Sequence, residues 1–219
     1  MIKLKDFKKA YMALKIDYLN VCSDVDYYVK VKANPAHEDY EYVKDSYDRL
    51  KMDERVAYHR LATFTECVLE MHTSATYDVP VIQNGIKREV RAAIDFTFDD
   101  DYRRGCYCVK LNVYVFRDYE FYKQLLGDSH KDVLEDIDIV FDQDDHGMMN
   151  LYGLQREIID IANDGKNCYP CSICSDETMI SEDFFLECGF KALEDYIKNR
   201  VVDAANDFIK HLNELELEH

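Results

Sequence analysis

The stretch TYDVPVIQNGIKREVRAAIDFTFDDDYRRGCYCVKLNVYVF, residues 76–116, alternates apolar and polar side chains over two long runs. Such alternation is typical of β-strands that bury one face in a core. Asn84 and Gly85 follow a first short apolar run, and this pair favours a tight hairpin because both residues tolerate positive φ angles. A second turn, at residues 99–105, separates the two alternating runs. The stretch therefore predicts an antiparallel meander of three strands over about 77–116.

Helical periodicity lies on both sides of this meander. The first helix is expected where apolar residues recur at steps of three and four, at Leu4, Phe7, Tyr11, Leu14 and Tyr18. A second is expected from about Asp53, with one face made by Val56, Thr63, Phe64, Cys67, Val68 and Met71. A long C-terminal helix is expected from the stripe Phe190, Leu193, Ile197, Val201, Ala204, Phe208 and Leu212. A short helix is expected directly before this long helix. Its N-cap is Ser181, and it ends near Gly189.

These patterns predict an α+β fold, in which the meander packs against N-terminal helices and the long C-terminal helix. A further strand is expected at 136–142, at an edge of the sheet. With seven glycines and three prolines in the chain, we expect one domain at 1–216 rather than two joined by a flexible linker. Its parts are a helical part at 1–75, the sheet at 76–145 and a helical part with a cysteine cluster at 146–216. Residues 217–219 are interpreted as the remnant of a vector tag.

The charge of the chain is strongly acidic and unevenly distributed. Its formal net charge is -17, and residues 128–187 hold 16 acidic side chains against the three basic ones Lys131, Arg156 and Lys166, which is -13. Such a field repels nucleic acid and anionic membranes and favours a basic protein surface as partner. No apolar run approaches the roughly 20 residues that span a bilayer, and no signal-type segment follows the N-terminus. We therefore expect a cytoplasmic protein with neither a nucleic acid nor a membrane as direct partner.

A cluster of cysteines is the candidate metal site. Cys168, Cys171 and Cys174 recur at every third residue, a spacing that can wrap around one zinc ion. Tetrahedral zinc needs a fourth ligand, for which Cys188 is the first candidate and His146 the second. Another grouping pairs Cys171 and Cys174 with Cys106 and Cys108, which lie two apart on one expected strand and so share a face. The alternative is that all these cysteines are reduced thiols without a metal.

Three other motifs fail or stay open as alternatives. Pro170-Cys171-Ser-Ile-Cys174 matches half of the zinc nucleoside deaminase signature, but no histidine is followed two residues later by the required glutamate. The acidic run from Asp142 begins like a calcium loop, yet its twelfth position is Gly153 instead of glutamate. Asp95, Asp99, Asp100 and Asp101 could hold magnesium for phosphodiester chemistry, which defines the alternative of a metal-dependent enzyme acting on nucleotides or nucleic acid.

The densest acid of the chain is the candidate partner-binding surface. Eight carboxylates and one lysine lie at 128–145, and the carboxylates are Asp128, Asp132, Glu135, Asp136, Asp138, Asp142, Asp144 and Asp145. A row of carboxylates on a rigid scaffold can imitate nucleic-acid phosphates. The sequence therefore favours a non-enzymatic interaction protein that acts as a nucleic-acid mimic or as an inhibitor of a nucleic-acid-binding protein. Inhibitors that viruses make against host nucleic-acid machinery behave in this way. Self-association is a further alternative, because residues 1–75 carry a net charge of only -1.

Overall fold

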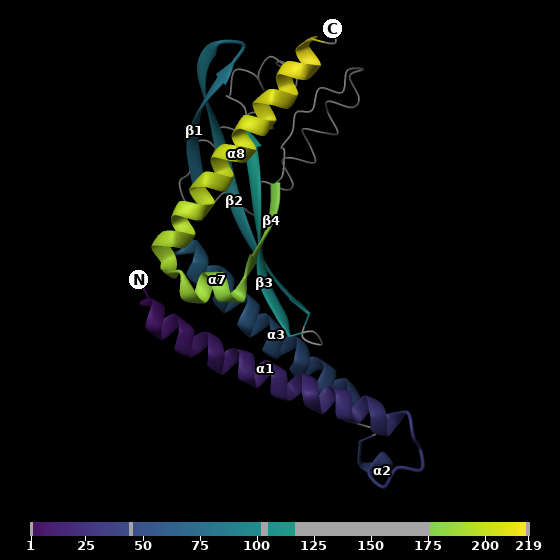
Figure 1. Ribbon diagram of the computed structural model, residues 1–219. Helices are drawn as coiled ribbons and strands as arrows, with labels where there is room; N and C mark the ends of the chain where they lie inside the picture. The colour runs from purple at the N-terminus through teal and green to yellow at the C-terminus, as the bar shows by residue number, and fades with distance from the viewer. Residues whose placement is uncertain (1, 44–45, 102–104, 117–175, 218–219) are drawn as a thin grey trace, which may run out of the picture.

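The computed structural model describes residues 2–43, 46–101, 105–116 and 176–217. Helices and strands follow the chain in three groups (Figure 1). The N-terminal group is helical, and its members are α1 (Leu4–Lys32), α2 (Tyr40–Val43) and α3 (Tyr47–Glu70). The middle group is the meander of β1 (Thr76–Gln83), β2 (Ile86–Asp101) and β3 (Cys106–Phe116). The last group is β4 (Asp176–Ser181), α7 (Glu182–Glu187) and α8 (Gly189–Leu217).

The four described strands form one antiparallel sheet in the order β1-β2-β3-β4, which confirms the predicted meander and the α+β class. Asn84 and Gly85 connect β1 to β2 with φ angles of 50° and 78°, as a two-residue hairpin of the primed type requires. β4 was not expected from the sequence pattern, because its six residues are too few to display a period. The strand predicted at 136–142 lies outside the described residues.

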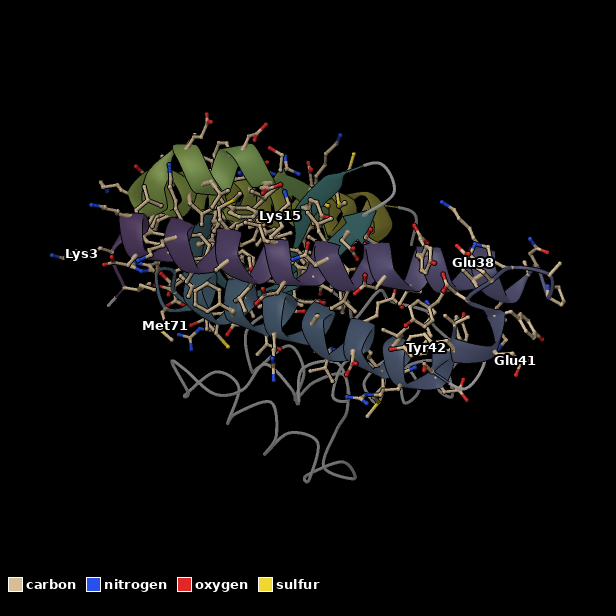
Figure 2. All side chains as sticks on the ribbon, turned by 90° about the horizontal axis from the view of Figure 1, so that it is seen from below. Lys3, Lys15, Glu38, Glu41, Tyr42 and Met71 are labelled. Carbon is tan, nitrogen blue, oxygen red and sulfur yellow. The ribbon has the colours of Figure 1, made fainter. Side chains whose placement is uncertain are left out.

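One face of the sheet forms the core with the helices. Its buried side chains are Val79, Val81, Val90, Ala92, Ile94, Phe96, Phe98, Tyr107, Val109, Leu111, Val113, Val115 and Ile180. In Figure 1, α8 crosses this sheet, while α1 and α3 run antiparallel and extend past its end. α2 lies at the far end of the α1–α3 pair, where Figure 2 shows Glu38, Glu41 and Tyr42 opposite the end that carries Lys3 and Met71.

α1 and α8 bury the faces that the sequence predicts, whereas α3 does so only in part. Phe7, Tyr11 and Tyr18 of α1 are buried, and so are Leu193, Ile197, Val201, Ala204 and Phe208 of α8. α3 begins at Tyr47 instead of Asp53 and buries Leu61, Ala62, Thr65, Val68 and Leu69. Of the predicted face, Val56 and Met71 are 39% and 61% exposed. That part of the prediction was wrong because α3 packs against both α1 and β2, which turns its buried stripe away from the predicted one.

Two local features fix the ends of α7 as predicted. The Ser181 side chain accepts a hydrogen bond from the Phe184 backbone N–H at 3.4 Å, which satisfies one of the N–H groups that a helix start leaves without a partner. Gly189 has a φ of 78° and separates α7 from α8. The short helix thus ends where glycine can adopt the left-handed conformation.

α3 covers a stretch of β2 that pairs with β3 on one side and, within the described ranges, with no strand on the other. β1 pairs with β2 only as far as Ala93, so the same edge of β2 continues without a described strand partner beyond it. There the Glu66 carboxylate accepts the Phe98 N–H at 2.7 Å, and the Tyr58 hydroxyl donates to the Phe98 carbonyl at 3.0 Å. Two side chains of one helix therefore satisfy both backbone groups of Phe98, which closes the edge to a further strand.

Candidate functional site

The predicted acidic surface and most of the cysteine cluster lie outside the described residues. This holds for all eight carboxylates of 128–145 and for Cys168, Cys171 and Cys174. The fourth candidate ligand, Cys188, is described: it is the exposed C-cap residue of α7. Within the described ranges, no group of three His, Cys, Asp or Glu side chains is arranged to hold a metal ion.

The alternative magnesium site divides between the two faces of the sheet. Asp95 and Asp99 point to the face opposite the core, and by strand geometry their Cα atoms lie about 13 Å apart. Asp99 faces Lys110 on β3, with 3.9 Å between its Oδ2 and the ammonium. Asp100 has the opposite parity and lies on the core face, across from Tyr107. These three carboxylates therefore do not converge on one ion, and the side chain of the fourth candidate, Asp101, lies outside what the structure describes.

Cys106 and Cys108 do share a face, as the sequence predicts. The residues that alternate with them on β3, Tyr107 and Val109, are buried in the core, so both thiols belong to the opposite face. Cys106 is exposed and Cys108 is half-buried. The Cys108 thiol lies 3.7 Å from the carbonyl oxygen of Asp99, and its Cα partners are Asp99 on one side and Ser181 on the other.

A cluster of polar groups inside the core was not predicted from the sequence. The Tyr18 hydroxyl of α1 donates to Asp100 Oδ2 at 2.8 Å. Lys15, one turn earlier on α1, donates to both carboxylate oxygens of Glu182 at 2.5 and 2.7 Å, and its ammonium lies 4.0 Å from the centre of the Tyr107 ring. Figure 2 shows Lys15 where α1 approaches α7. These contacts join α1 to the end of the β2–β3 hairpin and to the start of α7.

Burial and nearby carboxylates hold Tyr107 of this cluster, and two side chains that interact with it, Tyr11 and Cys22, in their protonated forms. Burial, followed by the charge of Asp100, raises the pKa of Tyr107 to about 12. Burial and the nearby Glu54 raise the pKa of Cys22 to about 11, against the opposing effect of Tyr18. Burial and Glu182 raise the pKa of Tyr11 as well. A phenol or thiol acts as a nucleophile or base in its charged form, so these groups are poorly suited to either role near neutral pH.

The buried hydroxyls of Tyr107 and of the neighbouring Tyr11 find no hydrogen-bond partner among the residues that the structure describes. The Glu182 carboxylate acts on Tyr11 through its charge, but it makes no hydrogen bond of normal length with that hydroxyl. Sequence reasoning missed the cluster because its members are far apart along the chain: Lys15 and Glu182 are separated by 167 positions. Only the odd placement of a charged residue, Asp100, in phase with the apolar side of β2 signalled it.

An open hollow of about 370 Å³ lies between the end of α3 and the start of α8. The His72 ring stacks on Phe190 with centroids 3.5 Å apart, and its Nε2 lies 3.0 Å from the carbonyl oxygen of Ile2. Lys191 and Glu194 bring opposite charges to its rim. These contacts explain how the chain start is held against α3 and α8, and they define no reactive group.

The fold and these sites place the chain in the α+β class of antiparallel-sheet proteins. Comparison with protein-family models, with curated proteins and with solved structures gives no match. Among the described helices, none has a stretch long and apolar enough to cross a bilayer.

Proposed function

We propose that the chain is a non-enzymatic interaction protein whose acidic segment at 128–145 binds a basic surface of a partner protein. The observation that carries this proposal is the local charge: eight carboxylates and one lysine lie within that segment. A surface of this density attracts a basic partner over about a Debye length, roughly 8 Å at physiological salt. The same charge repels phosphate, so the nucleic-acid-binding surface of a protein is a suitable target and a nucleic acid is not.

The described interior supports a binding role over a catalytic one. Its phenols and the Cys22 thiol are held in the protonated state. Of the acids considered for magnesium, Asp100 lies on the other face of the sheet from Asp95 and Asp99, which are about 13 Å apart. The contacts made by Lys15, Tyr18 and Glu66 all join one element to another. A rigid scaffold of this kind is what a row of displayed carboxylates needs in order to present its charges in a fixed arrangement.

Charge reversal with a matched control tests the proposal. In one variant Asp142, Asp144 and Asp145 become lysine, and in the other the exposed α8 residues Asp195, Asp203 and Asp207 do. The two variants change the net charge equally and differ only in position. We expect the first to release the basic proteins that the unchanged chain captures at about 0.1 M salt, while the second retains them. If both variants release these proteins equally, or if neither variant releases them, the segment is not the binding surface.

Competition with duplex DNA distinguishes a nucleic-acid mimic from a general acidic binder. A mimic occupies the DNA-binding surface of its partner, so excess duplex DNA displaces it. A partner that holds the chain and DNA at the same time binds the chain through some other basic surface.

A further inference from the structure

Two thiols stand together on the face of the sheet that points away from the core. Cys106 and Cys108 are separated by one residue on β3, so their Cα atoms lie about 6.8 Å apart and their side chains project in the same direction. Cys106 is exposed and Cys108 is half-buried, which leaves the pair accessible from one side. Cys106, which carries the first thiol, follows Gly105 and is the first residue of β3, so the strand fixes its backbone.

This spacing suits a bridging ion better than a disulfide. A disulfide holds its Cβ atoms about 3.8 Å apart, whereas Cβ atoms two residues apart on a strand are separated by nearly the full repeat of about 6.8 Å. Two metal–sulfur bonds of about 2.3 Å each span up to about 4.6 Å between the sulfurs. Each Sγ therefore needs to lean only about 1 Å toward the other, which a χ1 rotation supplies.

The surroundings select the kind of ion. Within the described residues, no third His, Cys, Asp or Glu side chain joins the pair in a metal-holding group, so these residues offer an ion two sulfur ligands and no complete tetrahedral or octahedral set. Soft thiolates select copper(I), zinc and iron–sulfur clusters, and of these copper(I) is the one that is satisfied by two ligands. Burial and then the charge of Asp99 raise the pKa of the Cys108 thiol, while Lys110 on the same face opposes them, so this thiol gives up its proton when a metal ion replaces it.

We propose that Cys106 and Cys108 form a two-coordinate binding site for copper(I). On binding, the two thiols release two protons to solvent and form two sulfur–copper bonds, so the site changes from two neutral thiols to a complex with one negative charge. The oxidation state of the copper does not change. The weak contact of the Cys108 thiol with the Asp99 carbonyl, at 3.7 Å, is given up for the metal bond. The acidic segment at 128–145 has no part in this site.

Alkylation with iodoacetamide, followed by mass spectrometry of the peptides, reads each cysteine separately. The whole chain is treated without oxygen, with and without one equivalent of copper(I) in a competing chelator buffer. We expect copper(I) to slow alkylation of Cys106 and Cys108 together by about tenfold or more, because a metal-bound thiolate is no longer available as a nucleophile. Half-buried Cys67 of α3, which belongs to none of the candidate metal sites, is the control within the same sample, and its rate stays unchanged.

Two variants test whether the thiols act as a pair. In Cys106→Ser, we expect the protection of Cys108 to be lost, since one thiolate does not hold the ion. In Cys171→Ser/Cys174→Ser, we expect the protection of Cys106 and Cys108 to persist. The proposal is overturned if copper(I) leaves both rates unchanged, if Cys108 stays protected in Cys106→Ser, or if protection vanishes with Cys171 and Cys174. The last outcome would place these thiols in a four-thiolate site instead.

Discussion

Lys15 of α1 forms an ion pair with Glu182 of α7, with 2.5 Å between its ammonium nitrogen and the nearer carboxylate oxygen. Both side chains are largely buried, at 15% and 16% exposure, and the same ammonium lies over the Tyr107 ring. One lysine therefore ties the first helix of the chain to the segment that follows β4. An ion pair in this position differs from the surface pairs of α8, which are open to water.

Replacing Lys15 with methionine is expected to lower the free energy of unfolding by about 2 kcal/mol, because Glu182 keeps a partly buried charge without its partner. The matched control is Lys191→Met, whose side chain is 83% exposed and lies 3.5 Å from Asp195. That change is expected to cost less than about 0.5 kcal/mol. Urea denaturation measures both, and similar losses for the two variants would mean that the Lys15 pair contributes no more than a surface pair.

Removing single hydroxyls separates partnered from unpartnered phenols. Tyr18→Phe loses the hydrogen bond to Asp100 and is expected to cost about 1.5–3 kcal/mol, the usual range for a bond to a charged group. Tyr11→Phe removes a buried hydroxyl that has no partner, so we expect a change near zero or a small gain in stability. Denaturation of the two variants under the same conditions is the test. A larger loss for Tyr11→Phe would reveal a partner for that hydroxyl.

The raised pKa values predict a loss of stability at alkaline pH. Tyr107 has an ordinary pKa of 10.0 and a folded pKa of about 12, so folding favours its protonated form. Its contribution is fully present below pH 10 and is lost as the pH rises through about 12. Cys22 adds the same effect between 9.0 and about 11. Between pH 10.0 and about 12, the free energy of unfolding should decline less steeply in Tyr107→Phe than in the unchanged chain. An identical decline would show that Tyr107 does not contribute.

The closure of the β2 edge depends on the acceptor at position 66. Glu66→Ala leaves the Phe98 N–H without its 2.7 Å partner and is expected to cost about 1–3 kcal/mol. Glu66→Gln keeps an oxygen acceptor and should retain most of that stability. Thermal denaturation ranks the two, and hydrogen exchange at the Phe98 amide gives a local measure: exchange there should rise in the alanine variant alone.

Local patterns predict the meander and the terminal helices because the buried residues of each of these elements recur at a single spacing. Asn84-Gly85 fixed the first hairpin, and the stripe from Leu193 to Phe208 fixed α8. β4 escaped prediction because Ile180 alone is buried among Thr178, Met179, Ile180 and Ser181, and pairing with β3 creates the strand. The face of α3 was misjudged since two neighbours bury different sides of it.

The interior cluster shows the limit of sequence reasoning about sites. Asp100 reads as one of three acids in a solvated turn, and its place opposite Tyr107 follows only from the register of β2 with β3. Lys15 lies off the apolar face that the sequence predicts for the first helix, and only the packing of α7 makes it a largely buried partner. The predicted pairing of Cys106 and Cys108 on one face was confirmed because strand alternation alone decides it.

The acidic segment is the central claim, and the salt dependence of binding tests it most directly. A captured basic partner, once isolated, is titrated with the unchanged chain and with the variant carrying lysine at 142, 144 and 145, from about 0.05 to 0.5 M salt. Binding by the unchanged chain should weaken steeply with salt, and the variant should bind more weakly and with a much flatter dependence. Equal affinity and equal salt dependence for both proteins would contradict the proposed function.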